Sequence, residues 1–156
     1  KKMINVEEAI EVLRKFLNQI QTNSSKERNK LVVILHSLDH ITRLTKVLRE
    51  QQKIEAIYIQ ERLLGEWYDL LSEIKETIHD DNNLEKITLT LEQKSQKVAV
   101  ERRVRRNHYF ERTVANDAEL ELVVSKVEAL LWIDRLIYHY WRATARMAEL
   151  KELKGV

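Results

Sequence analysis

Two short stretches of the sequence hold the residues that could do chemistry. In the first, His36 and His40 are one helical turn apart, and Asp39 lies between them on the same polar side. Imidazole and carboxylate groups at this spacing can ligate a divalent ion, but further ligands have to come from elsewhere. Arg43 stands beside these residues and disfavours a cation. The spacing therefore favours a solvated polar helix face, and only an approach of His139 from the second stretch would strengthen the metal interpretation.

The second stretch, "ALLWIDRLIYHYWRATARM", runs from Ala129 to Met147. With the spacing of an α-helix, its apolar side carries Trp132, Ile133, Leu136, Ile137, Tyr140 and Met147. The opposite side, which we expect to face water or an acidic neighbour, carries Arg135, His139, Arg142 and Arg146. Asp134 lies at the apolar boundary, where an unpaired carboxylate is costly. We expect it to bond Tyr138 or another helix; a metal or ligand role is the alternative.

Composition narrows the classes of protein that need to be considered. The 156 residues include no Cys, no Pro and two Gly, which argues against disulfides, thiolate chemistry, sandwiches and open α/β folds. Because 27 Lys and Arg face 25 Asp and Glu, the net charge of +2 gives no general attraction to nucleic acid or lipid. Apolar runs are too short to span a bilayer. No Ser-His-Asp order, Gly-rich loop or carboxylate pair in a cleft indicates an enzyme, and the first residue, Lys1, suggests a fragment.

Apolar residues recur at helical spacing in five segments, which predicts an all-α antiparallel bundle of about five helices. The expected helices run from about 6 to 21, from 25 to a break at 49–53, onward to about 78, from 84 to 114, and from 117 to 153. One long bent helix in place of the second and third is the alternative. A polar residue followed three later by Glu predicts N-caps at Asn5, Ser24, Asn82 and Asn116.

The stretches "LHSLDHITRL" (35–44) and "LLWIDRLIYH" (130–139) align with each other at an offset of 95 residues, and Asp39 then matches Asp134. Since both lie midway along amphipathic helices, they predict degenerate repeats, 1–80 and 82–156, within a single domain spanning 1–156. Both stretches resemble the acidic signature of the PhoU family. "EALLWIDRLIYHYWRA" and "LLGEWYDLLSEI" are similar to PhoU-like domains at the C-terminus of bacterial sodium-dependent phosphate cotransporters.

This resemblance implies a PhoU-like bundle that serves as the cytoplasmic regulatory domain of an inner-membrane protein involved in phosphate transport. Its partners would be the transmembrane part of that transporter or another protein, with a homo-oligomer as a further option. The family binds metal clusters through acidic pairs one helical turn apart. Here Arg43 and Tyr138 stand at the second acidic positions. We therefore expect no metal and no other cofactor.

The most basic segment is "ERRVRRNHYFER" (101–112), in which arginines alternate with His108, Tyr109 and Phe110. Nucleic-acid-binding modules combine cations and stacking rings in this way. With a net charge near zero, a solvated helix or pairing with the acidic run 72–85 is the simpler interpretation. We expect a surface for an acidic protein or an anionic membrane, made by Arg102, Arg105, Arg106 and Arg112. A stand-alone adaptor or nucleic-acid-binding bundle is the alternative function.

Overall fold

The computed structural model describes residues 2–50, 72, 76, 84–114 and 120–154. These residues form four long helices: α1 (Lys2–Leu17), α2 (Ser25–Arg49), α5 (Leu84–Val114) and α6 (Leu120–Lys154). No strand occurs among them, so the all-α fold class is confirmed. Apart from the single residues 72 and 76, the helix expected between the break at 49–53 and about 78 lies outside the described residues. The expected N-caps Asn82 and Asn116 lie outside them as well.

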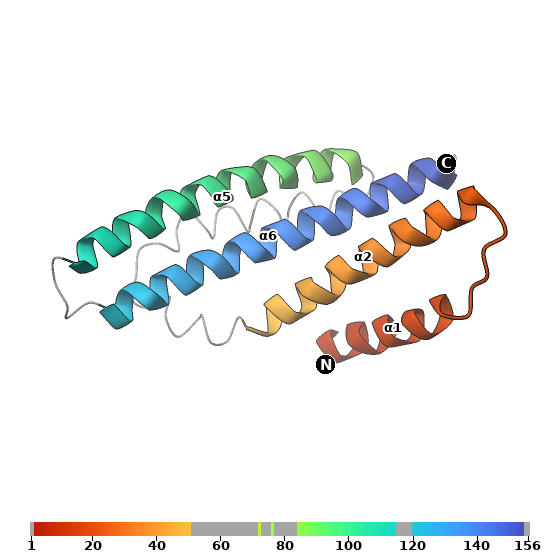
Figure 1. Cartoon of the computed structure of the whole chain (residues 1–156), viewed down its shortest axis with the longest axis horizontal. Coiled ribbons are helices and arrows are strands. Elements are labelled where there is room, and N and C mark those ends of the chain that lie inside the picture. The colour runs from red at the N-terminus through yellow and green to blue at the C-terminus, as the bar shows by residue number, and fades with distance from the viewer. Residues whose placement is uncertain (1, 51–71, 73–75, 77–83, 115–119, 155–156) are drawn as a thin grey trace.

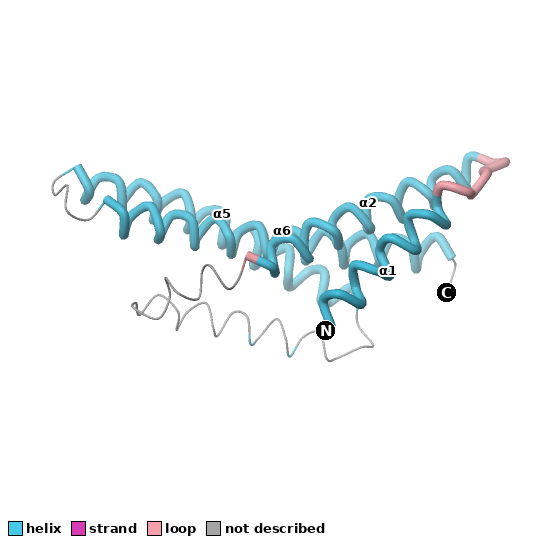
Figure 2. Tube along the Cα trace, turned by 90° about the horizontal axis from the view of Figure 1, so that it is seen from below, coloured by secondary structure: helices cyan, strands magenta, loops and turns pink. Residues whose placement is uncertain are grey.

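The described helices lie side by side, with α6 between α5 and α2 and with α1 on the outer side of α2 (Figure 1). Seen from below, they form one bent layer (Figure 2). Neighbouring helices run antiparallel, as short connections favour. Because α6 has a neighbour on each side, its side chains can join α2 to α5.

The apolar side of α6 forms the larger core. Trp132, Ile133, Leu136 and Ile137 are buried, as predicted, and pack with Val47 of α2 and with apolar residues of α5. Tyr140 is partly buried against the same core. The prediction was wrong for Met147, which is 46% exposed. A helical wheel gives the direction of a side chain, but it does not say how far along the helix its neighbours cover that side.

A smaller core joins α1 to α2 through Ile10, Leu17 and Leu38. Leu13 and Ile20 continue the apolar spacing of Ile10 and Leu17, but they are 39% and 37% exposed. Among the described helices, α1 packs mainly on α2. A single neighbour covers only part of an amphipathic stripe, and the outer residues of the stripe therefore stay at the surface.

The ends of the helices agree with the sequence where a specific cap is present. Ser24 accepts a hydrogen bond from the Glu27 backbone N–H, and the Glu27 carboxylate accepts one from the Ser24 backbone. Helix α2 begins at Ser25 as predicted, and α5 has the predicted bounds. The prediction of an N-cap at Asn5 was wrong, because α1 already begins at Lys2. The helix ends at Leu17, earlier than the expected end at about residue 21.

Candidate functional site

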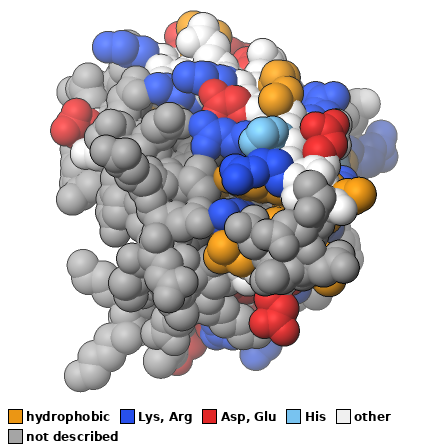
Figure 3. Space-filling model, turned by 90° about the vertical axis from the view of Figure 1, so that its left-hand side faces the viewer, with side chains coloured by type: hydrophobic (Ala, Val, Ile, Leu, Met, Phe, Trp, Pro, Cys, Tyr) orange, Lys and Arg blue, Asp and Glu red, His pale blue; other side chains and the backbone are white. Residues whose placement is uncertain are grey.

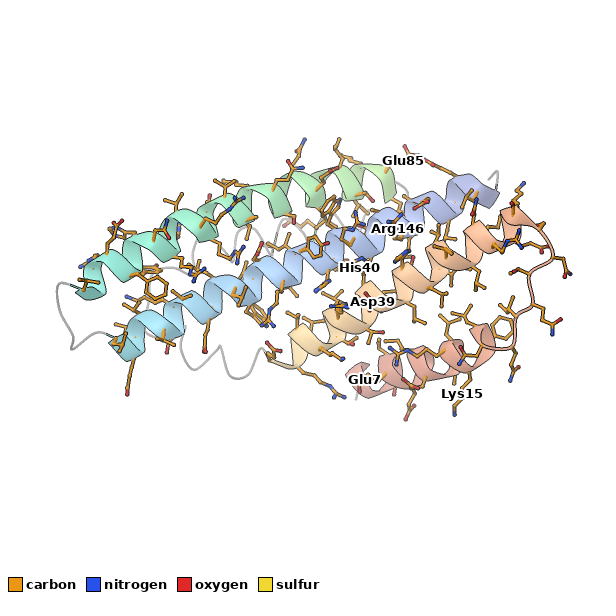
Figure 4. All side chains as sticks on the ribbon, in the orientation of Figure 1. Glu7, Lys15, Asp39, His40, Glu85 and Arg146 are labelled. Carbon is orange, nitrogen blue, oxygen red and sulfur yellow. The ribbon has the colours of Figure 1, made fainter. Side chains whose placement is uncertain are left out.

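His40 of α2 and His139 of α6 meet at the interface between these two helices. Their Nδ1 atoms are 3.2 Å apart and their ring centroids are 5.5 Å apart. Figure 4 shows His40 and Asp39 on neighbouring positions of α2, beside α6. Tyr138 makes edge-on contacts with both imidazole rings. His139 therefore does approach the first stretch, which the sequence analysis named as the one arrangement that would strengthen the metal interpretation. The prediction that His139 faces water or an acidic neighbour was wrong.

The electrostatics of this pair favour neutral imidazoles. A separation of 3.2 Å suits a hydrogen bond in which one ring donates and the other accepts, and this requires at least one neutral ring. Burial lowers the pKa of His40, and the Arg142 guanidinium lowers it further, although Asp39 acts in the opposite direction. Burial likewise lowers the pKa of His139, and His40 is the second cause. Two charged rings at this distance would repel each other.

The other residues considered as metal ligands do not join the pair. Asp39 accepts a 2.9 Å hydrogen bond from Arg43 Nε, and both side chains are more than half exposed. His36 is exposed, and Asp134 pairs with α5 instead. In the part of the chain that the structure describes, no three His, Asp or Glu side chains are grouped to hold a metal ion. The fold therefore brings together two of the five candidate ligands.

Asp134 has the interhelical partner that its position at the apolar boundary requires. Its Oδ2 atom lies 2.9 Å from Nε of Arg102 on α5, in an ion pair that lacks the alignment of a hydrogen bond. Burial raises the pKa of Asp134, while Arg102 and then Arg103 lower it. The Arg102 side chain is 30% exposed and belongs to the α5–α6 interface. This position differs from the outward surface that we expected for Arg102.

The remaining arginines of the basic segment have separate surroundings. Arg105 lies 4.0 Å from Glu101, and the Arg106 guanidinium lies 5.5 Å from the centroid of the Phe110 ring. Arg112 is exposed near the end of α5. Figure 3 views the molecule from this end, and Lys and Arg side chains gather there with Asp and Glu side chains among them. This end of the molecule therefore presents charges of both signs among its described side chains.

The sequence did not predict how α6 holds the last turn of α2. Trp132 Nε1 donates a 2.7 Å hydrogen bond to the Val47 carbonyl, which also accepts from the Glu50 backbone N–H. Arg135 Nη2 donates a 2.6 Å bond to Glu50. A buried indole N–H needs an acceptor, and the last carbonyl groups of a helix lack partners within that helix. The sequence therefore indicates that each group needs a hydrogen-bond partner. Their match depends on the alignment of the two helices, which no local pattern gives.

No protein-family model, curated protein or solved structure matches this chain. None of the described helices combines the length and the apolar character that a membrane-spanning helix requires. The fold and the site define an all-α protein in which a histidine pair and interhelical ion pairs join adjacent helices.

Proposed function

We propose that this chain is a non-catalytic regulatory domain that acts by contact with a partner protein in phosphate transport. The observation that carries the proposal is the position of the two signature-like stretches. They are 95 residues apart in the sequence, yet they lie on adjacent helices and join through His40 and His139. This pairing fits a bundle built from two related halves, as the resemblance to PhoU-like domains implies.

The surroundings of three buried hydroxyl groups, those of Ser37, Thr45 and Thr144, support a role without catalysis. Ser37 donates to the Val33 carbonyl at 3.0 Å, and Thr45 donates to the Thr42 carbonyl at 2.8 Å. Thr144 donates to carbonyls of its own helix in the same way. A hydroxyl nucleophile needs a general base within hydrogen-bond reach. These hydroxyls instead bond helix backbone, and the paired histidines bond each other.

Exposed apolar side chains support a protein partner. Val12 and Phe16 on α1 are 68% and 59% exposed, and Val32 and Leu35 on α2 are 50% and 47% exposed. Exposed apolar groups that lie one turn apart on a helix, as the two residues of each pair do, can serve as a contact surface. In our proposal the partner is the transmembrane part of a phosphate transporter, and the domain lies on the cytoplasmic side of the inner membrane.

A genetic experiment tests the proposal. The coding region for residues 1–156 is deleted in the natural host, and uptake of radiolabelled phosphate is measured over a range of external phosphate concentrations. We expect uptake to lose its normal dependence on external phosphate. A Phe16→Asp variant of the full protein should reproduce this loss, whereas Lys15→Asp, which changes the adjacent exposed residue of α1, should have little effect. Identical uptake curves with and without residues 1–156 would rule the proposal out.

A further inference from the structure

A polar groove opens between α1, α2 and α6, beside the His40–His139 pair. Its volume is about 370 Å³, within the range of small-molecule sites. The residues that line it include Thr42 and His139. Its charged lining consists of Arg14 from α1, Asp39, Arg43, Lys46 and Glu50 from α2, and Arg135 from α6. Three helices therefore contribute charged groups to one space.

The charge of this groove is positive. Four cationic side chains and two carboxylates line it, which leaves an excess of two positive charges when His139 is neutral. Outside the lining, the Glu11 carboxylate offsets one of them, because it lies 2.7 Å from Arg14 Nη1. A concave surface with charge of one sign attracts small ions of the opposite sign.

The cations keep donors that a ligand can use. Arg43 bonds Asp39 through Nε, and Arg135 bonds Glu50 through Nη2, so each guanidinium has further N–H groups. Both ion pairs are at least 40% exposed, and exposed pairs contribute little to stability. An anion with two or more charges can therefore share these arginines at small cost.

We propose that the groove binds a small soluble molecule that carries at least two phosphate or carboxylate groups. Guanidinium groups suit both groups because their N–H donors match a pair of oxygens. Two anionic groups are needed because the cations approach from different helices. The site goes beyond the proposed contact with a transporter and does not depend on it.

A ligand bound in the groove should hold α1 more firmly against α2 and α6. Arg14 reaches across to α2, where its Nη2 donates to Thr42 at 3.1 Å, while the apolar contact between these helices is limited to the smaller core. A ligand held by Arg14, Arg43 and Arg135 would join all three helices. Since a ligand that binds only the folded state stabilises it, occupancy should raise the melting temperature.

Calorimetric titration of the chain 1–156 with inorganic pyrophosphate tests the proposal. We expect saturable binding of one pyrophosphate per chain and a higher melting temperature. The variant R43Q/K46Q removes two exposed cations of the groove, and its affinity should fall by about tenfold or more. The variant K26Q/R28Q makes the same change in charge on exposed residues at the start of α2 and should bind like the unmodified chain.

Three results would overturn the proposal. The first is the lack of saturable pyrophosphate binding by the unmodified chain. The second is an equal loss of affinity in R43Q/K46Q and K26Q/R28Q, which would show an effect of net charge alone. The third comes from co-sedimentation with phosphatidylglycerol vesicles, which present the same phosphate chemistry as a lipid headgroup. Binding to vesicles without binding to pyrophosphate would assign the groove to a membrane surface.

Discussion

The contact between His40 and His139 makes the stability of the fold depend on pH. Both pKa values are lowered from the usual 6.5, mainly by burial. The folded protein therefore keeps these rings neutral at a pH where the unfolded chain already binds protons. The free energy of unfolding should fall as the pH drops from just above 6.5 toward the folded-state pKa values. Urea unfolding between about pH 8 and pH 5.5 measures this slope.

A matched pair of substitutions isolates the contribution of the two rings. In the double variant H40N/H139N, the decrease below about pH 6.5 should become smaller. The variant His108→Asn changes an exposed histidine on α5, and the decrease in the free energy of unfolding should persist in it. A slope that is unchanged in H40N/H139N would show that other groups cause the pH dependence.

The same pair of histidines leads to a prediction about metal. Two imidazoles supply only two ligands, Asp39 is engaged by Arg43, and Arg142 adds positive charge near His40. A structural zinc site needs four ligands, so we expect no stoichiometric metal in protein purified without chelators. Elemental analysis by mass spectrometry measures this directly. One zinc, iron or manganese per chain, lost in His139→Ala, would instead make this pair the centre of a metal site.

Trp132 stabilises the fold both by burial of its side chain and by a hydrogen bond, and substitutions can separate the two contributions. The side chain is 6% exposed, and its indole N–H bonds the Val47 carbonyl. Trp132→Ala should lower the free energy of unfolding by about 3–5 kcal/mol because it removes a large buried side chain. Trp132→Phe keeps an aromatic ring and should cost less, with about 1 kcal/mol from the lost hydrogen bond. Denaturant unfolding gives both values. Leu131→Ala, at an exposed neighbouring position, is the control, and an equal loss there would contradict the assignment of faces.

At the scale of elements, two ion pairs with the same Nε–Oδ2 distance differ in burial. Arg102 and Asp134 join α5 to α6, whereas Arg43 and Asp39 lie on α2 alone, and both pairs have an Nε–Oδ2 distance of 2.9 Å. The exposed fractions are 30% and 17% for the first pair and 58% and 51% for the second. Because water screens exposed charges, the interhelical pair should have the larger coupling energy.

Double-mutant cycles measure that difference. Arg102→Gln with Asp134→Asn should give a coupling of about 1–2 kcal/mol, and Arg43→Gln with Asp39→Asn about 0.3–0.5 kcal/mol. Equal coupling energies would mean that burial does not strengthen the interhelical pair of Arg102 and Asp134. Helix α5 should lose packing against α6 in the first cycle only, which hydrogen exchange of the α5 backbone can detect.

The sequence predicts elements where the signal is local. The capping pair Ser24 and Glu27 marks the start of α2, and the apolar period of α6 predicts that Trp132, Ile133, Leu136 and Ile137 are buried. It does not predict which charges meet across helices. Arg102 was expected at the surface and contacts Asp134, because one helix can slide by a turn along another without any change in local pattern. The groove between α1, α2 and α6 likewise depends on how the helices align, so the sequence could not predict it.

At the scale of the whole molecule, the distribution of charge argues against nucleic acid as a partner. The net charge is +2, and Arg102 in the basic segment of α5 is turned toward Asp134. Tight binding to DNA or RNA needs several phosphate contacts and falls steeply with salt. We therefore expect only weak, non-specific binding of a labelled duplex or single strand. Fluorescence anisotropy at about 50 and 150 mM salt measures it. Submicromolar binding at the higher salt concentration, lost when Arg102, Arg105, Arg106 and Arg112 are all changed to Gln, would establish nucleic-acid binding in place of the protein contact that we propose.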